Sequence, residues 1–181
     1  MMAGWQNNKL PRDSLESQGS FQRLFGEVYE YSPWIAEGAW NALQGHAAPS
    51  FADLAAEMAK AVRHAAVHAQ SALLQAHPEL AGKLALAGDL TDNSLAEQAG
   101  AGLDQCSPEE LEEISDLNAR YHFRFGFPFI IAVKDLSRTE IIAAMRRRLD
   151  QSPESERAEA LRQVNRIAEI RLERIATCEE A

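Results

Sequence analysis

Helix-start signals recur along this chain and divide nearly all of it into helical segments. A serine followed by a proline, a favoured pair at a helix N-terminus, stands at positions 32–33, 107–108 and 152–153. Serines 107 and 137 are each followed three residues later by a glutamate, which completes a capping box. Apolar residues then recur at spacings of three and four, and no long stretch alternates with a period of two. The sequence therefore predicts an all-α, single compact domain of about seven helices.

The expected helices begin near residues 21, 32, 50, 91, 107, 137 and 152. The helix that starts at Ser50 is expected to run without a break to Leu73, because one stripe carries Leu54, Met58, Val62, Ala65, Ala69 and Leu73. Residues 1–18 are expected to form a disordered N-terminal segment, and residues 19–178 the helical domain.

Composition excludes several classes of protein. The longest apolar runs are far shorter than the roughly 20 residues that span a bilayer. A formal net charge of −9 disfavours nucleic acid as a partner. The one basic cluster, Arg146–Arg148, is expected to offset the dipole at a helix C-terminus. The polar start of the chain and its two cysteines, which form no disulfide framework, indicate a cytoplasmic protein.

Two histidines have the spacing of metal ligands. His64 and His68 stand four residues apart on the helix expected from Ser50, where one face can present both to a metal ion. No acidic residue follows in the pattern of the zinc hydrolases, so a solvated helix face is the alternative interpretation. His46 and His122 have no partners visible in the sequence.

His77 differs from the other histidines in its context. Pro78 disfavours the helical conformation for the residue before it, so His77 should lie at the end of its helix. An imidazole exchanges protons near neutral pH, which makes His77 a candidate acid–base group. On spacing alone, an ordinary histidine at a helix end is the alternative.

A short helix near residue 94 groups three different polar side chains. Ser94, Glu97 and Gln98 are neighbours on one helical face. They offer a hydroxyl, a carboxylate and an amide, a set suited to a ureido group or an imidazolidinone ring. A carboxylate such as Glu97 near an imidazole favours the protonated ring. The alternative is the polar surface of a short helix.

Residues 125–133 are expected to be extended and apolar. Gly126 and Pro128 interrupt a helix, while Phe127, Phe129, Ile130 and Ile131 favour burial. Buried backbone outside a helix must still satisfy its N–H and C=O groups. A polar ligand is one way to satisfy them.

Several segments together resemble the 2-oxo-4-hydroxy-4-carboxy-5-ureidoimidazoline (OHCU) decarboxylases, enzymes of urate degradation that produce (S)-allantoin. The resemblance runs from about Phe21 to Ile175, in the order and spacing of residues 26–30, 32–34, 77–82, 90–98, 102–103, 117–121 and 125–129. It implies that His77 and Glu97 are catalytic. It implies that the substrate is bound by Pro78, Ser94, Leu95, Ala96, Glu97, Gln98, Phe129, Ile130, Ile131, Ala132 and Val133. Glu79 stands where many relatives carry Asp, and Lys134 where many carry Arg.

The resemblance also implies a cofactor-free reaction. The charge left by decarboxylation can spread over a neighbouring carbonyl and imine, so no metal, pyridoxal or thiamine is required. The implied partners are a small-molecule ureidoimidazoline substrate, a second copy in a homodimer, and a functional link to urate oxidase and hydroxyisourate hydrolase. Two alternatives remain: a catalytically inactive helical module that binds allantoin-like ureides, and a metal hydrolase using His64 and His68.

Overall fold

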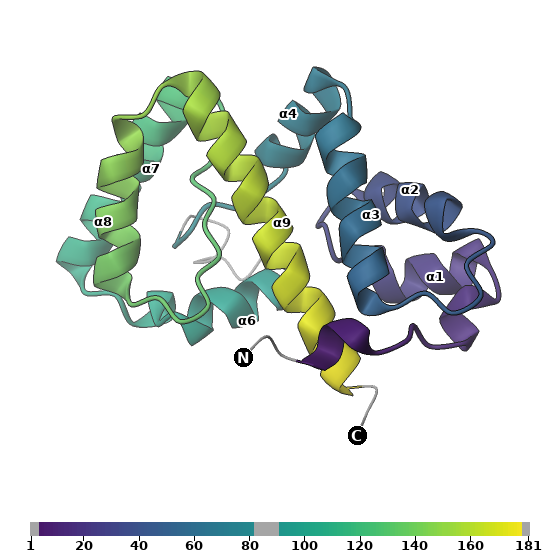
Figure 1. The fold of residues 1–181 in the computed structure, drawn as a ribbon. Helices are drawn as coiled ribbons and strands as arrows, with labels where there is room; N and C mark the ends of the chain where they lie inside the picture. The colour runs from purple at the N-terminus through teal and green to yellow at the C-terminus, as the bar shows by residue number, and fades with distance from the viewer. Residues whose placement is uncertain (1–3, 82–90, 179–181) are drawn as a thin grey trace. The chain divides into compact units, whose positions relative to one another are not determined.

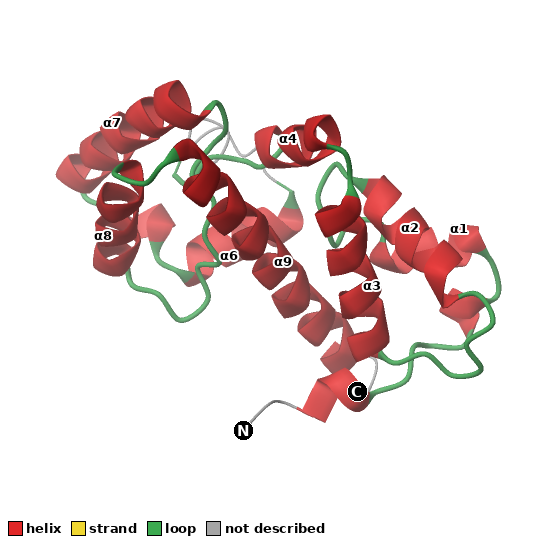
Figure 2. Cartoon of the chain, turned by 45° about the horizontal axis from the view of Figure 1, so that its top comes forward, coloured by secondary structure: helices red, strands yellow, loops and turns green. Residues whose placement is uncertain are grey.

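The computed structural model describes residues 4–81 and 91–178. Within these ranges it consists of helices joined by loops, and the only β-type pairing is a single bridge between Lys9 and Ser50 (Figure 2). None of the described helices is both long and apolar enough to cross a membrane. The predicted all-α fold is confirmed. Gly82 and Leu90, which belong to the segments that carry the family resemblance, lie outside the described residues.

The elements follow one another along the chain as labelled in Figure 1. The α-helices of the described residues are α1 (Gln18–Phe25), α2 (Pro33–Leu43), α3 (Phe51–His64), α4 (Val67–Gln75), α6 (Asp92–Gly100), α7 (Pro108–Phe125), α8 (Arg138–Leu149) and α9 (Pro153–Cys178). Three short 3-10 helices accompany them: η1 (Gly4–Asn7), η2 (Asp13–Leu15) and η3 (Leu103–Gln105).

The helix starts predicted near residues 32, 50, 91, 107, 137 and 152 are confirmed, whereas the helix expected from Phe21 begins at Gln18 and ends at Phe25. Reciprocal capping boxes open α7 at Ser107 and α8 at Ser137, and a third opens α3, where the partner of Ser50 is Asp53. The hydroxyl and the backbone N–H of Ser50 both donate to Asp53, at 2.7 and 2.8 Å. These bonds favour the charged carboxylate and hold the pKa of Asp53 below its ordinary value.

The helix expected from Ser50 to Leu73 is instead two helices. Ala65 takes an extended backbone conformation, so α3 ends at His64 and α4 begins at Val67. The side-chain amide of Gln70 in α4 donates to the carbonyls of Val62 (2.8 Å) and Arg63 (3.2 Å). Because these bonds satisfy carbonyls at the end of α3, the break leaves fewer polar groups without partners.

The chain divides into two compact units. The first contains residues 1–73 and 165–181, and the second contains residues 74–164. Helix α9 contributes its first part to the second unit and its remainder to the first.

The first unit is built on aromatic residues and includes the start of the chain. Helix α2 contacts α1 and α3, and η1 contacts α3. Trp5 is 8% exposed, and its ring meets that of Phe51 edge-on with centroids 6.3 Å apart. The backbone N–H of Leu10 donates to Pro49, and that of Phe51 donates to Asn8. Residues 4–17 therefore differ from the disordered segment expected over 1–18, because they bury apolar side chains and bond to the start of α3; residues 1–3 lie outside the description.

Two buried polar contacts also stabilise the first unit. The guanidinium of Arg171 lies 3.5 Å from the carboxylate of Glu30, and both side chains are buried. The hydroxyl of Tyr29 donates to Asn165 at 2.8 Å. Burial, reinforced by the negative charge of Glu169, raises the pKa of Tyr29, so this hydroxyl remains a donor.

The second unit contains the end of α4, helices α6, α7 and α8, and the start of α9. Helix α7 packs against α8, and an ion pair between Glu113 and Arg146 links them. The loop from Gly126 to Ser137 joins these two helices without helical turns of its own, green in Figure 2. This loop contains most of the segment that was expected to be extended; Phe125 is the last residue of α7.

Candidate active site

All residues that the sequence singled out for catalysis or substrate binding lie in the second unit. They occupy three places: the turn that follows α4, helix α6, and the loop between α7 and α8. Hydrogen bonds connect the turn to α6 and to α7, whereas the loop bonds to side chains of α8 and α9.

The turn after α4 contains His77 and Pro78. Helix α4 ends at Gln75, and the backbone N–H of His77 donates to Leu74 at 3.3 Å, so His77 does lie at the end of its helix. His77 and Pro78 are half-buried, and Leu80 is buried. The turn then passes through Ala81, whose φ of +47° is in the left-handed region that residues other than glycine rarely adopt.

Helix α6 presents its predicted binding residues unequally. Ser94 and Gln98 are each 5% exposed, and Glu97 is half-buried. Leu95 is 46% exposed, and Ala96 is also exposed. The helix starts where the sequence predicted, because the hydroxyl of Thr91 accepts from the N–H of Ser94 at 3.3 Å. Ser94, Glu97 and Gln98 thus share the more buried face of α6.

The amide of Gln98 binds the turn that carries His77. Its oxygen accepts from the backbone N–H of Ala81 at 2.9 Å, and its nitrogen donates to the carbonyl of Glu79 at 3.4 Å. These contacts bring α6 and the turn together. They also occupy one acceptor position and one donor position of an amide that was expected to bind substrate.

The loop after α7 begins at Gly126, whose φ of +76° ends that helix in the left-handed conformation. Phe129, Ile130 and Val133 are buried, whereas Ile131 and Ala132 are half-buried. The ring of Phe129 meets that of Tyr121 edge-on with centroids 5.2 Å apart. The side chains of Phe129 and Ile130 are therefore core residues of this unit.

Protein side chains satisfy part of the backbone of this loop. Arg148 donates to the carbonyl of Ile130 at 2.7 Å, and the N–H of Ala132 donates to Gln163 at 2.9 Å. Within the described residues, the backbone of Ile131 makes no hydrogen bond. The sequence left open what this backbone bonds to. Protein side chains satisfy the carbonyl of Ile130 and the N–H of Ala132, while the backbone of Ile131 is still able to bind a ligand.

Sequence reasoning missed a buried polar network behind this loop. Arg148 and Glu156 form an ion pair, with Arg148 Nε donating to the carboxylate at 2.9 and 3.2 Å. The hydroxyl of Tyr121 also donates to Glu156, and the guanidinium of Arg148 stacks on Phe129 with its carbon 4.5 Å from the ring centroid. Burial and the hydrogen bond to Glu156 raise the pKa of Tyr121.

The role expected for Arg148 was therefore incomplete. Its position in the last turn of α8 is as expected, but its guanidinium is only 5% exposed and holds the loop. The signal was its spacing: Arg148 follows Ile141 by seven residues and Met145 by three, which places it on the buried face of α8.

The spacing of His64 and His68 does not place them on one face of one helix, as the sequence predicted. His64 is the last residue of α3 and His68 belongs to α4, so the two do not lie on one continuous helix. Among the described residues, no group of three or more His, Cys, Asp or Glu side chains is arranged to hold a metal ion. His46 and His122 are exposed.

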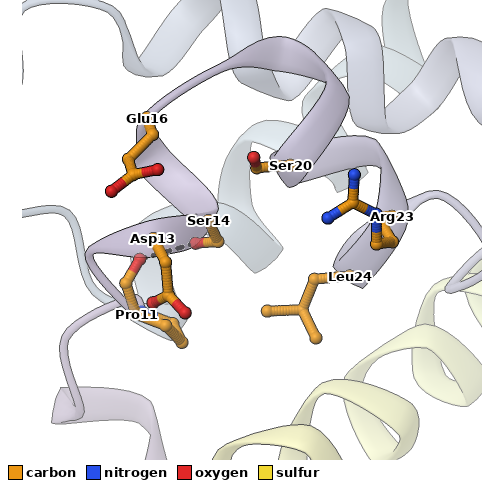
Figure 3. Close-up of a pocket in the computed structure, with 7 residues that line it drawn as sticks. All are labelled: Pro11, Asp13, Ser14, Glu16, Ser20, Arg23 and Leu24. Carbon is orange, nitrogen blue, oxygen red and sulfur yellow. Dashed lines mark hydrogen bonds between the residues drawn. The ribbon is translucent and has the colours of Figure 1, made fainter.

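A cavity of about 300 Å³ lies in the first unit, and none of the predicted site residues lines it (Figure 3). Its lining combines apolar residues with exposed carboxylates and one guanidinium: Pro11, Asp13, Ser14, Glu16, Ser20, Arg23 and Leu24. The hydroxyl of Ser14 is already bonded to the carbonyl of Pro11 at 2.7 Å. The cavity's charged residues Asp13, Glu16 and Arg23 are exposed.

Comparison with known proteins gives a consistent result. A family model described as OHCU decarboxylase matches residues 14–173. The chain is 43% identical over 167 residues to a 2-oxo-4-hydroxy-4-carboxy-5-ureidoimidazoline decarboxylase of Haloferax volcanii, which covers 92% of each chain. It is 34% identical over 154 residues to the mouse protein of the same name, covering 85% of each chain.

Solved structures agree with these sequence matches. The crystal structure of an (S)-allantoin synthase superposes with a TM-score of 0.69 at 31% identity, covering 89% of this chain and 52% of that one. The chain therefore spans about half the length of that protein. An OHCU decarboxylase crystallised in the presence of (S)-allantoin has a TM-score of 0.66 at 18% identity and shares the fold over 89% of this chain and 99% of its own.

Proposed function

Because the chain belongs to the OHCU decarboxylase family, we propose that it decarboxylates OHCU to (S)-allantoin in urate degradation. The observation that carries this proposal is the joining of the His77 turn to α6 through the amide of Gln98. It places a titratable imidazole in one unit with the polar face of α6 and with the partly unbonded backbone near Ile131.

The reaction needs no external electron acceptor. In OHCU, one ring carbon carries the carboxylate and a hydroxyl, and the next carries the ureido group and a C=N bond. When the carbon–carboxylate bond breaks, its electron pair forms a C=C bond, and the C=N pair moves onto nitrogen, which takes a proton. The resulting enol becomes the ketone when its hydroxyl loses a proton and the ureido carbon gains one. The products are CO2 and allantoin.

His77 is the acid–base group in this proposal. The enol step releases one proton and consumes another, so a group that titrates near neutral pH can serve both transfers. Protonation of the planar carbon from one fixed side produces a single enantiomer, which links the position of His77 to the (S) configuration. The carboxylate of Glu97, on the buried face of α6, favours the charged imidazole where the two approach.

The remaining predicted residues bind the substrate. The hydroxyl of Ser94 and the second N–H of Gln98 are suited to the ureido group. The backbone of Ile131 is suited to the ring carbonyl and N–H groups. Pro78 and the exposed side chain of Leu95 offer apolar contact to the ring.

The test follows (S)-allantoin by circular dichroism, starting from urate supplied with the two enzymes that convert it to OHCU. We expect the wild-type protein to form chiral product far faster than buffer. His77→Ala should lose at least about 100-fold in kcat, because general acid–base catalysis typically contributes that much. The control is His122→Ala, which removes an exposed histidine of the same unit.

Two outcomes would contradict the proposal. A wild-type rate equal to that in buffer excludes turnover, and allantoin binding measured by calorimetry would then favour the inactive module. Full activity of His77→Ala would instead exclude His77 as the acid–base group.

Three finer features belong to the same proposal. A cytoplasmic location is supported by Cys106 and Cys178, which are free thiols in the structure. A functional link to urate oxidase and hydroxyisourate hydrolase is supported by a Bacillus subtilis relative, the uric acid degradation bifunctional protein PucL; this chain matches 29% of it at 39% identity. Phe123, which is 94% exposed on α7, offers apolar surface for a homodimer.

A further inference from the structure

The backbone conformation of the turn that carries His77 is stabilised by residues outside the turn. Ala81 adopts a left-handed backbone conformation, which costs a residue other than glycine on the order of 1 kcal/mol. Such a conformation persists only when the surroundings fix it. The contacts that fix this turn therefore also determine where the imidazole lies.

Two buried amides supply these contacts. Gln98 bonds to Glu79 and Ala81, as described above. Asn118 in α7 donates from Nδ2 to the carbonyl of Leu80, the residue between them, at 3.0 Å. Three consecutive residues of the turn are thus bonded to side chains from two helices.

A buried asparagine at position 118 destabilises the core. It is 5% exposed, and its neighbour Leu117 and the following Tyr121 are also buried. Within the described residues, its Oδ1 atom is buried and has no hydrogen-bond partner. Burial of an unsatisfied carbonyl costs about 1–3 kcal/mol, so an apolar side chain would stabilise this part of the core better. The hydrogen bond from Asn118 to the carbonyl of Leu80 is the interaction that offsets this loss of stability.

We propose that Asn118 is a positioning residue, which fixes the carbonyl of Leu80 and so holds the His77 imidazole where it reaches the substrate. This inference rests on the proposed function, and it adds a residue that acts on His77 through the carbonyl of Leu80. Proton transfer depends on placement within a fraction of an ångström, so release of the turn lowers the rate more than it weakens binding.

The experiment compares Asn118→Ala with a matched control. Gln70→Leu also removes a bond from a part-buried side-chain amide to backbone carbonyls, but those carbonyls belong to residues 62 and 63 in the first unit. We expect Asn118→Ala to lower kcat by about 10- to 100-fold while KM changes less than about threefold. Gln70→Leu should leave both constants unchanged.

A second measurement does not depend on turnover. NMR of the His77 ring should show shifted resonances in Asn118→Ala and unshifted ones in Gln70→Leu. If Asn118→Ala fails to fold by circular dichroism, Asn118→Leu keeps the volume nearly unchanged and removes the Nδ2 donor, and the same results are expected from it.

The outcomes separate this inference from the proposed function. Wild-type kcat together with unshifted His77 resonances in the Asn118 variant overturns the positioning role, even if the wild type is an active decarboxylase. An inactive wild type overturns the proposed function, and the NMR comparison still decides whether Asn118 positions His77.

Discussion

A single hydroxyl completes the charged cluster inside the second unit. Glu156 is fully buried and accepts bonds from Tyr121 and from Arg148. A buried carboxylate keeps its charge only where donors replace the water that it has lost. Arg148 meets the same requirement, since it bonds to Glu156 and Ile130 and stacks on Phe129.

Tyr121→Phe tests how much that hydroxyl contributes. The change removes one bond to a buried charge without altering volume appreciably, so we expect a loss of about 1–3 kcal/mol in the free energy of unfolding. Urea denaturation followed by circular dichroism measures it. The control is Tyr31→Phe, since Tyr31 is 62% exposed and should change by less than about 0.5 kcal/mol. Equal effects in the two variants would show that the Glu156 bond does not stabilise the fold.

At the scale of the helices, the capping boxes set how stability responds to acid. The hydroxyl of Ser137 and its backbone N–H both donate to Glu140, and they hold the pKa of Glu140 below its ordinary value. A carboxyl with a lowered pKa stabilises the folded state at pH values above its ordinary pKa. That contribution disappears as the pH falls through the lowered value.

Ser137→Ala should therefore change two measurements together. We expect the pKa of Glu140 to rise toward its ordinary value in a carboxyl-carbon NMR titration, because the hydroxyl bond is lost. The stability difference from wild type should be largest near pH 7 and should shrink as the solution is acidified below about pH 4. Thr139→Ala, an exposed change in the first turn of the same helix, is the control. An unchanged Glu140 titration would contradict the role of the Ser137 hydroxyl.

The elements were predictable to the extent that their signals are local. The boxes at Ser107 and Ser137 involve residues three positions apart, and the end of α4 before Pro78 follows from the proline itself. The break after His64 was not predictable from the apolar stripe. It depends on Ala65 leaving the helical conformation and on the amide of Gln70 folding back onto α3.

The same distinction applies to the candidate site. The sequence identified the polar and titratable residues of the site. The family resemblance then assigned them to catalysis or to substrate binding. The backbone partners of Gln98, Asn118 and Arg148 could not be predicted, because they lie 17 to 38 residues away along the chain. Tertiary hydrogen bonds of this kind leave no periodic signal.

At the scale of the whole molecule, the start of the chain is part of a folded unit. Trp5 contacts Phe51, Leu10 is buried, and Lys9 pairs with Ser50. Disorder was expected here because terminal residues are commonly poorly ordered. Two large apolar side chains and a few backbone bonds are enough to order it.

Trp5→Ala distinguishes an ordered from a disordered start. If Trp5 is packed as described, its truncation should cost on the order of 3 kcal/mol in the free energy of unfolding. A disordered segment would give a change near zero. Guanidinium denaturation measures the difference, and Phe123→Ala, which truncates an aromatic ring that is 94% exposed, should have little effect.

The division of α9 between the two units bears on how the protein is made. The unit that contains the candidate site is one uninterrupted stretch, residues 74–164, whereas the other needs residues 1–73 and 165–181 together. During synthesis, domains generally fold as units as they emerge from the ribosome. Residues 1–73 must therefore wait for residues 165–181, while all residues of the unit that contains the candidate site are synthesised earlier. Chains that stop at residue 164 and are tethered to the ribosome by an added flexible linker longer than the exit tunnel should already protect residues 74–164 from proteases.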